Sequence, residues 1–402
     1  MNIAVVNLIT STTVLPMKLK SLMGLKIARK PNTDEWINIV RLCKRMAEFG
    51  NNVVLYVSDV FLPEKTISGN IPGLTIRYLP TRLTQVFSPA IIPFTPSLYK
   101  ELISRDFDII LASETLQIGS ILAILAGIRK KIPVIIWQEV DVWPPQYILR
   151  FAERFYYTLI FKPFLIKKIR GIIGRSSSAI EFLKSIGICE DKILGIIPTP
   201  IDTTIFKPIP KNEARVKLCL PLDRPILLCV TTLDKRRGLD LLLLTIEKVT
   251  QKIPEVLLLI KGNGPLRENL ETTIEKKGLK NNVRIDYSYT AAPEMPLFYS
   301  AADISLVVTE FGLLPFSALE SLACGIPVIS TFKRGLKDFI IDEETGFLVD
   351  RDPDLLANKI IKILRYNKFN NEKIIEFAKK TIGIDRVISV FREVFGNETK
   401  KK

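Results

Sequence analysis

The most informative absence in this 402-residue chain is histidine, which does not occur at all. Without an imidazole, the sequence excludes Ser-His and Cys-His nucleophilic machinery, metals bound by histidine, and an imidazole base. Any chemistry must therefore use carboxylates, cations, backbone groups or the substrate itself.

Cysteine is also scarce: the chain has five, scattered and without C-x-x-C spacing. This pattern argues against a disulfide framework or a zinc site and fits a reducing cytosol. No apolar run reaches the length of a membrane span, and the opening residues MNIAVVNLIT lack a basic region before their apolar stretch. We therefore expect a first strand instead of a signal peptide, and a cytoplasmic protein.

Positive charge is in excess and unevenly distributed. Residues 1–200 carry 25 Lys/Arg against 15 Asp/Glu, and residues 201–402 carry 32 against 27, which together give the net charge of +15. The basic first half suggests an acidic partner, such as anionic lipid, a phosphorylated acceptor or nucleic acid. The excess of positive charge is explained equally well by solubility or by the lysine-rich composition common in thermophilic proteins. Because the chain lacks a nucleic-acid recognition module, we do not expect nucleic acid as the partner.

What the chain does contain is a regular alternation of short β-branched runs and longer helical patterns, typical of parallel α/β sheets. The predicted strands are 2–7, 52–58, 74–80, 108–113, 133–138, 171–174, 225–233, 255–262, 282–288, 304–309 and 327–331.

The length predicts two doubly wound, Rossmann-like domains with a ligand at a shared cleft. We place them at 1–200 and 201–370. A Pro- and Thr-rich linker lies near 198–212. A helix over about 371–396 is a candidate to pack back on the first domain.

The segment 257–270, LLLIKGNGPLRENL, has the pattern of a strand, a glycine-rich turn and a helix. Gly262 and Gly264 allow close backbone approach, and Pro265 suits the first turn of a helix. Backbone N–H groups in this turn could face a phosphate. An ordinary tight turn uses the same residues, so both interpretations stay open.

Three consecutive cations, Lys235, Arg236 and Arg237, follow another predicted strand. Cations just beyond the carboxyl end of a strand suit an anionic ligand. A solvated basic loop is the alternative, particularly for the first two.

The segment 309–331, TEFGLLPFSALESLACGIPVIST, carries two glutamates near a short apolar helix. Ten positions at about 100° each bring Glu320 about 280° round from Glu310, so the two cannot share a helix face. An ionised Glu320 inside the apolar helix needs a partner. That partner is either a cation in an ion pair or the hydroxyl groups of a ligand.

Taken together, these segments resemble the retaining glycosyltransferases of family 4, glycosyl transferase group 1, which have the GT-B fold. The segment ADISLVVTEFGLLPFSALESLACGIPVIS from Ala302 is similar to the family's most characteristic motif, without a gap from Pro315 to Ile329. Four further segments resemble the family in order and spacing: 196–206, 262–270, 281–304 and 342–360.

The resemblance implies that domain 1–200 binds the acceptor and domain 201–370 binds a nucleotide-sugar. It also implies roles for individual residues. Glu320 matches the glutamate that binds the nucleotide ribose, and Arg237 matches a diphosphate-binding lysine. Thr232 stands where a second phosphate-binding cation is usual. Gly312 occupies the position of the glutamate that contacts the donor sugar, and Glu310 lies two residues out of register with it.

Other family positions fall on less distinctive residues. Glu139, or its neighbour Gln138, lies where the family usually has a histidine near the donor sugar. Asp338 occupies the place of an acid that follows a glycine pair. The remaining donor-binding candidates implied by the resemblance are Gly262, Asn263, Gly264, Tyr289, Leu313 and Leu314.

The implied reaction is transfer, with retention, of a hexosyl group from a UDP- or GDP-sugar to a glycan or a lipid-linked acceptor, without a metal or other cofactor. The departures at Gly312, Thr232 and the missing histidine leave a catalytically impaired nucleotide-sugar-binding protein as the alternative.

Residues 150–171 interleave aromatic side chains with Arg and Lys. They could lie on an anionic membrane surface, which would make the protein peripheral at the inner face of the membrane. A core helix with a basic exposed side is the other interpretation.

Overall fold

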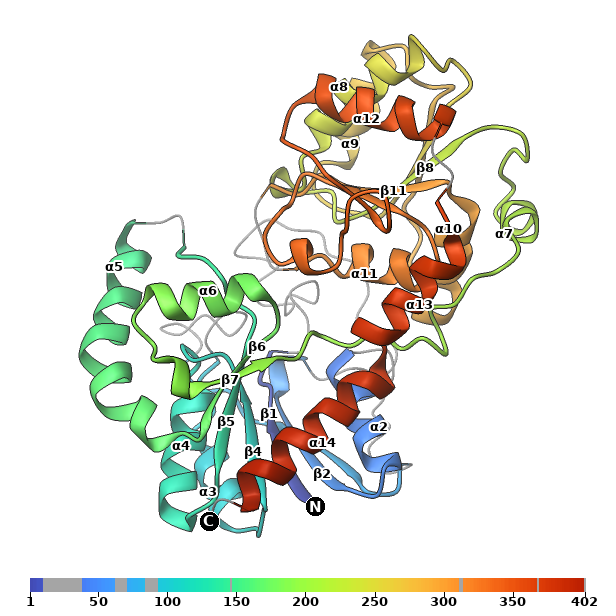
Figure 1. Ribbon diagram of the computed structural model, residues 1–402. Coiled ribbons are helices and arrows are strands. Elements are labelled where there is room, and N and C mark those ends of the chain that lie inside the picture. Colours follow the sequence, from blue (N-terminus) through green and yellow to red (C-terminus); the bar gives the residue numbers. More distant parts are fainter. Residues whose placement is uncertain are drawn as a thin grey trace. The chain divides into compact units, whose positions relative to one another are not determined.

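The computed structural model describes residues 1–9, 38–61, 71–83, 93–144, 147–310, 314–366 and 369–400 (Figure 1). The chain divides into two compact units. The first comprises the described residues up to Pro200 together with those from Ile384 onward, and the second comprises Ile201–Gly383.

The first unit is built on a seven-stranded parallel sheet with the strand order β3-β2-β1-β4-β5-β6-β7. Its strands are β1 (Asn2–Val6), β2 (Asn52–Ser58), β3 (Leu74–Leu79), β4 (Ile109–Ser113), β5 (Val134–Gln138), β6 (Gly171–Gly174) and β7 (Ile193–Ile196). Its α-helices are α2 (Asn38–Glu48), α3 (Ser97–Ile103), α4 (Ile118–Lys130), α5 (Tyr147–Tyr156), α6 (Ser177–Ser185) and α14 (Ile384–Lys400). Shorter turns are the 3-10 helices η2 (Asp59–Phe61), η5 (Ile166–Lys168) and η6 (Glu190–Lys192), and a π-helix, η4 (Tyr157–Leu165), continues α5.

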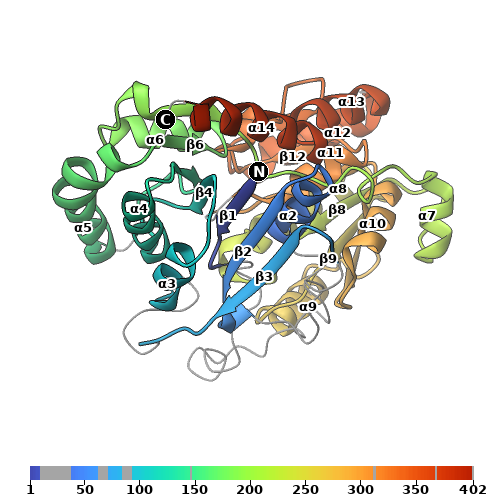
Figure 2. The ribbon, with the colours of Figure 1, turned by 90° about the horizontal axis from the view of Figure 1, so that it is seen from below.

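Helices cover both faces of this sheet, which is why its strands are nearly continuous apolar runs. On one face α2 and α14 pack against side chains of β1, β2, β4 and β5. On the other face lie α3, α4, α6 and η4. Figure 2 shows α3 and α4 on the far side of the sheet from α2.

The second unit has a six-stranded parallel sheet with the order β10-β9-β8-β11-β12-β13. Its strands are β8 (Ile226–Val230), β9 (Leu257–Lys261), β10 (Val283–Asp286), β11 (Ile304–Val307), β12 (Val328–Ser330) and β13 (Gly346–Leu348). Its α-helices are α7 (Lys211–Lys217), α8 (Leu239–Thr250), α9 (Arg267–Lys276), α10 (Met295–Ala301), α11 (Phe316–Ala323), α12 (Pro353–Tyr366) and α13 (Asn371–Thr381). The 3-10 turns are η7 (Lys235–Arg237), η8 (Ala292–Glu294) and η9 (Leu336–Asp338). Helices α10, α11 and α13 contribute to one core cluster, and α8, α9 and α12 to the other.

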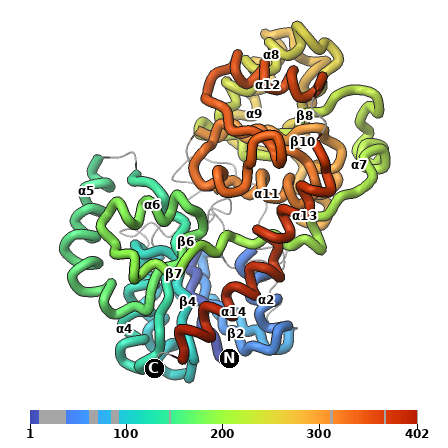
Figure 3. Tube along the Cα trace, viewed as in Figure 1, coloured from blue at the N-terminus to red at the C-terminus, as the bar shows by residue number. Residues whose placement is uncertain are grey.

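The predicted single helix over about 371–396 is wrong, because the structure has two helices there with different partners. Helix α13 packs into the second unit through Ile374 and Ala378, whereas α14 packs into the first through Ile388 and Phe391. The break falls at Gly383, where a Cβ would lie 2.5 Å from the carbonyl oxygen of Lys379. The second unit thus extends beyond the predicted end at 370 (Figure 3).

Each predicted strand is confirmed, and two short ones were missed. Strand β7 is only half-buried, pairs with β6 across a register shift, and is interrupted by Gly195 with a φ of 118°. Strand β13 has three residues and begins at Gly346, whose Cβ would lie 1.9 Å from the carbonyl oxygen of Val328. Among the described helices, none is both long and apolar enough to cross a bilayer.

Candidate functional site

The order of the strands in the second unit marks where a ligand would bind. In the sheet, β9 and β10 lie on one side of β8, and β11, β12 and β13 lie on the other. The direction in which successive strands are added therefore reverses between β8 and β11. Ligands of doubly wound sheets bind outside the carboxyl ends of the strands at such a switch point. Thr232 and Arg237 follow β8, and Glu310 follows β11. The switch point therefore coincides with residues predicted from sequence.

Glu320, on α11, is held by a partner that sequence reasoning missed. The Tyr299 hydroxyl donates a hydrogen bond to Glu320 Oε2, with an O–O distance of 2.5 Å. Tyr299 lies on α10, is 0% exposed, and packs edge-on against Phe206. Burial, followed by the negative charge of Glu320, raises the pKa of Tyr299 well above its usual value, so the hydroxyl keeps its proton and stays a donor. A rigid, buried donor thus fixes one oxygen of this carboxylate.

Thr232 and Arg237, both predicted at the diphosphate, are in direct contact. Arg237 Nε donates to Thr232 Oγ1 at 2.9 Å, and Thr232 Oγ1 donates to Asp234 Oδ2 at 2.9 Å. Only Nε of Arg237 is engaged in this way; its terminal nitrogens make no hydrogen bond within the described part of the chain. Burial lowers the pKa of the Arg237 guanidinium from its usual value, as expected for a cation withdrawn from water. Thr232 thus orients this cation.

The two neighbouring cations differ from Arg237. Arg236 is exposed and bonds to Asp234 through Nε at 3.2 Å and NH2 at 3.1 Å. Lys235 is exposed on the surface of η7. Both therefore have the environment of a solvated basic loop.

The glycines of the turn after β9 are required by close packing of the backbone. A Cβ on Gly262 would lie 1.7 Å from the carbonyl oxygen of Thr231, and one on Gly264 would lie 2.5 Å from that of Leu233. The Gly262 N–H donates to the carbonyl of Asp286, and the Gly264 N–H donates to the side chain of Asn263. In this conformation neither amide can donate to a phosphate. The glycines instead let the loop after β9 pack directly on the loop after β8.

The other donor-site candidates lie in contrasting environments. The Leu314 side chain is buried in the apolar core, so only its backbone could meet a ligand. Tyr289 is 60% exposed after β10. Glu310 is exposed, with Oε2 3.7 Å from NH2 of Arg351. Asp338 ends η9 and is half-buried.

Gly312 and Leu313 lie outside the described residues. Glu310 borders a hollow of about 420 Å³ at the carboxyl ends of β11, β12 and β13.

In the first unit, Glu139 belongs to a cluster of charged side chains at the carboxyl ends of β4, β5 and β6. Arg175 NH1 donates to Glu139 Oε2 at 2.7 Å, and both side chains are about one-tenth exposed. The Arg175 guanidinium lies over the ring of Trp137, 4.0 Å from its centroid. Gln138 points into the protein, where its Oε1 accepts hydrogen bonds from the backbone and hydroxyl of Thr115. Of the two candidates, Glu139 is therefore the one in a charged environment.

A second carboxylate, Glu114, joins this cluster and was not predicted. It follows β4 at the switch point of the first sheet, between β1 and β4, with a φ of 64° that is uncommon for a residue other than glycine. Its oxygens accept hydrogen bonds from the backbone N–H groups of Glu139 at 2.8 Å and Val140 at 3.1 Å. Burial outweighs these bonds and the charge of Arg175, and raises the pKa of Glu114 to about 7.

The sequence carried unequal signals for these missed residues. Glu114 stands directly after a buried apolar strand in LASETL, so its position at the sheet edge could have been noticed. Tyr299 is 21 residues before Glu320, and no local pattern connects them.

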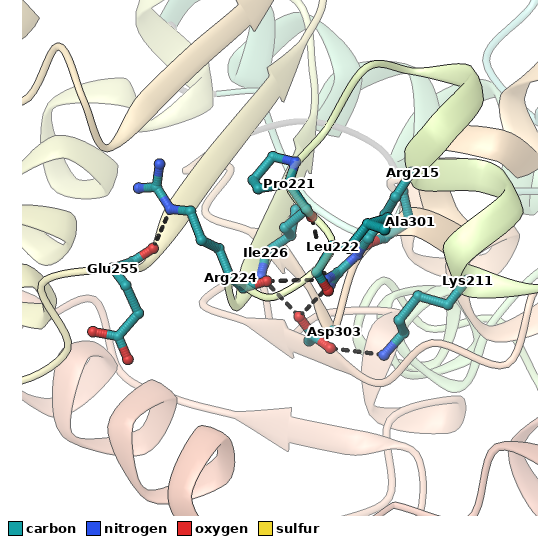
Figure 4. A network of polar contacts seen from close by, with 9 residues as sticks. All are labelled: Lys211, Arg215, Pro221, Leu222, Arg224, Ile226, Glu255, Ala301 and Asp303. Carbon is teal, nitrogen blue, oxygen red and sulfur yellow. Dashed lines mark hydrogen bonds and ion pairs between the residues drawn. The ribbon is translucent and has the colours of Figure 1, made fainter.

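A hollow of about 450 Å³ lies at the amino ends of the strands of the second sheet, on the side opposite the switch point. The charged side chains that line it are paired with one another and with backbone groups (Figure 4). Asp303 accepts from Lys211 Nζ at 2.7 Å, Arg215 NH2 at 2.9 Å and the Ile226 N–H at 2.7 Å. The rest of the Arg215 guanidinium donates to backbone carbonyls, including those of Ala301 and Leu222. This cluster ties the amino ends of β8 and β11 to α7, so the aspartate of the Ala302–Asp303 pair is structural.

Comparison with known proteins shows what the chain is similar to. Residues 210–381 match the family described as glycosyl transferases group 1. A GDP-mannose-dependent alpha-(1-6)-phosphatidylinositol monomannoside mannosyltransferase of Mycolicibacterium smegmatis is 29% identical over 180 residues, 42% of this chain and 46% of that protein. A D-inositol 3-phosphate glycosyltransferase of Segniliparus rotundus is 30% identical over 163 residues, 39% of this chain and 36% of that protein. The chain thus matches less than half the length of these curated relatives.

Solved structures are similar over the whole chain. Sucrose-phosphate synthase from Thermosynechococcus elongatus has a TM-score of 0.71 at 18% identity, covering 100% of both chains. Anabaena Alr3699/HepE in complex with UDP has a TM-score of 0.73 at 13% identity, covering 99% of this chain and 100% of that one. At this identity the likeness concerns the fold. Residues 210–381 thus match glycosyl transferases group 1, and the two parallel-sheet units have the GT-B fold.

Proposed function

We propose that the protein transfers a hexosyl group, with retention and without a metal, from a UDP- or GDP-sugar to a glycan or lipid-linked acceptor. The observation that carries this proposal is the Glu320 carboxylate, fixed by the buried Tyr299 hydroxyl at 2.5 Å. A carboxylate held in this way is suited to accept hydrogen bonds from the paired hydroxyls of a ribose.

Arg237 is the residue best placed to stabilise the diphosphate. It follows β8 at the switch point, and Thr232 holds its Nε while its terminal nitrogens point to no acceptor among the described residues. As the bond to the sugar breaks, negative charge develops on the leaving phosphate oxygen. A fixed guanidinium stabilises that charge without reorganising during the reaction.

A chain without histidine needs a route for the acceptor's proton. In a front-face reaction the departing phosphate oxygen takes this proton, and the new bond forms on the face from which the diphosphate leaves. The sugar then keeps its anomeric configuration. Glu139, paired with Arg175 at 2.7 Å, would bind hydroxyls of the sugar or the acceptor and not act as a base.

The choice of donor and acceptor draws on the relatives. One relative is named for a GDP-mannose donor and a phosphatidylinositol monomannoside, and another for D-inositol 3-phosphate. One structural neighbour was solved with UDP-glucose. We therefore keep both nucleotides and propose an acceptor that carries a phosphorylated or lipid-linked head group.

Glu320→Gln tests the assignment of the ribose site. The change keeps the shape of the side chain but removes its charge, so we expect affinity for UDP or GDP to fall about tenfold, as for loss of a hydrogen bond to a charged group. Glu275→Gln is the matched control, because Glu275 is an exposed residue of α9 paired with Lys280. Calorimetric titration gives the affinities, and release of nucleotide from a panel of UDP- and GDP-sugars gives the activity.

A second variant, Tyr299→Phe, separates positioning from charge. It preserves the buried ring but removes the donor to Glu320, so nucleotide affinity should fall by about three- to tenfold and the free energy of unfolding by about 1–3 kcal/mol. Tyr366→Phe, at an exposed position of α12, is its control. Unchanged nucleotide affinity in Glu320→Gln would overturn the ribose assignment. Nucleotide binding without any donor turnover would favour the impaired, binding-only alternative.

A further inference from the structure

The helix α5 and the π-helix η4 that continues it have their apolar surface on the outside. No residue of α5 is buried, and the exposed fractions reach 80% for Ile148, 64% for Phe151 and 51% for Phe155. In η4 the pattern continues with Leu159 at 51% and Phe164 at 65%. A surface helix normally turns such a stripe toward the core.

The spacing of these residues gathers them on one side. Ile148, Phe151 and Phe155 follow intervals of three and four residues, which place side chains one above another along a helix. Tyr157, Phe161 and Leu165 point the other way and belong to the core of the first unit.

Two cations of α5 contact groups of the first unit. Arg150 Nε donates to the carbonyl of Pro144 at 3.3 Å, and the Arg154 guanidinium lies 5.5 Å from the centroid of the Trp143 ring. Glu153 is half-buried, the environment expected on the inner side. The alternative of a core helix is wrong for α5, because none of its residues is buried. Its exposed side is mainly apolar and also carries Arg154.

Charge decides what kind of partner fits this face. Between residues 147 and 170 the cations are Arg150, Arg154, Lys162, Lys167, Lys168 and Arg170, and Glu153 is the single acidic residue. Lys167 and Lys168 are exposed in η5, immediately beyond the apolar stripe. Aromatic and aliphatic side chains flanked by cations match the boundary between the acyl chains and the head groups of an anionic bilayer.

A second copy of the chain fits this face less well. A two-fold interface brings the same patch of both protomers together, so it would set these cations against an identical set. Like charges at short range oppose such an association, whereas anionic head groups neutralise them.

We propose that residues 147–168, which we call the docking face, seat the protein on an anionic membrane surface. The helix axis would lie in the plane of the interface, with Ile148, Phe151 and Phe155 inserted below the head groups and Lys167 and Lys168 among them. The docking face deepens the proposed function by naming how a lipid-linked acceptor would be reached. Its existence does not depend on the reaction.

Vesicle flotation of the full chain tests this proposal. We expect the protein to float with phosphatidylcholine vesicles containing phosphatidylglycerol, and to bind at least tenfold less to phosphatidylcholine alone or in high salt, because screening weakens the cationic contacts. The double variant Phe151→Ser with Phe155→Ser should lose at least tenfold in binding to the anionic vesicles. Leu355→Ser is the matched control, since Leu355 is 50% exposed on α12 of the second unit.

A fluorescent probe locates the contact directly. Phe151→Trp should shift its emission to shorter wavelength with anionic vesicles and be quenched by lipids brominated on the acyl chain. Nucleotide affinity, measured on each variant without vesicles, should stay unchanged, which separates failure of the docking face from failure of the nucleotide site. The proposal is overturned if the Phe151/Phe155 variant floats like the wild type, or if sedimentation shows a dimer that this variant abolishes while vesicles bind neither protein.

Discussion

The Glu114 carboxylate lies where opposing effects act on a single ionisable group. Two backbone N–H groups and the nearby Arg175 favour its charged form, and burial opposes it. Burial is the largest of these effects, so the pKa rises from 4.5 to about 7. The sign follows from linkage: the folded protein binds the proton more tightly than the unfolded chain does. The stability contributed by this group is therefore complete below pH 4.5 and is lost as the pH rises through about 7.

This shift predicts a titration in the loop that carries Glu139. With valine labelled, the amide signal of Val140 should move with a midpoint near pH 7, because its N–H donates to Glu114. Glu114→Gln should abolish the titration, while Glu275→Gln on the exposed surface of α9 should preserve it. A Val140 signal that titrates near pH 4.5, or one that still moves near 7 in Glu114→Gln, would contradict the assignment.

The same variant has a consequence for stability. Gln carries no charge at any pH. The free energy of unfolding of Glu114→Gln, relative to that of the wild type, should therefore increase from pH 5 to pH 8 by up to about 2 kcal/mol. Denaturant titrations at the two pH values measure this difference.

At the scale of secondary-structure elements, the loops after β8 and β9 behave as one packed unit. Leu233 N–H donates to the carbonyl of Asn263, and Leu266 N–H donates to that of Leu233. Gly262 and Gly264 permit this approach. Because Thr232 lies within the first loop and holds Arg237, the packing of the loops sets the position of the predicted phosphate-binding cation.

Gly262→Ala tests this coupling. Its Cβ would meet the Thr231 carbonyl oxygen at 1.7 Å, so the two loops must separate, and we expect a loss of about 3 kcal/mol in the free energy of unfolding together with weaker nucleotide binding. The control, Gly396→Ala on α14, adds a Cβ into open space and should stabilise by about 0.5–1 kcal/mol. Denaturant titrations measure both changes. Wild-type stability in Gly262→Ala would show that the loops are not packed as described.

At the scale of the whole molecule, the chain leaves the first unit at Pro200 and returns to it at Ile384. Helix α14 supplies Phe391, whose ring packs edge-on against Trp137 with centroids 5.2 Å apart. Trp137 in turn donates to the carbonyl of Ile197 at 2.7 Å. The last helix therefore completes the core of the unit that begins the chain.

Removal of residues 384–402 should consequently affect the two units unequally. The first unit loses the side chains that cover Trp137, so its unfolding midpoint should fall by at least about 10 °C, as for the loss of several buried aromatic and aliphatic groups. Residues 201–383, expressed alone, keep both of their core clusters and should unfold cooperatively. Scanning calorimetry of the two fragments and the full chain measures this, and a first unit of unchanged midpoint would show that α14 is dispensable.

The sequence by itself determined the parts that depend on local pattern. Each apolar strand run and amphipathic helix is a property of neighbouring residues, so the parallel α/β class, most strands and the position of Glu320 on a short apolar helix followed from spacing and motif. The absence of histidine likewise limits the chemistry of this chain through composition alone.

Only the tertiary structure decided which distant groups meet. Tyr299 reaches Glu320 across 21 residues, and Glu114 meets the loop at Glu139 from a neighbouring strand. The split between α13 and α14, and the outward apolar face of α5, were equally hidden, because periodicity shows that a helix has an apolar side but not what that side contacts. Such contacts depend on how the elements are brought together in space, and a one-dimensional pattern does not record that arrangement.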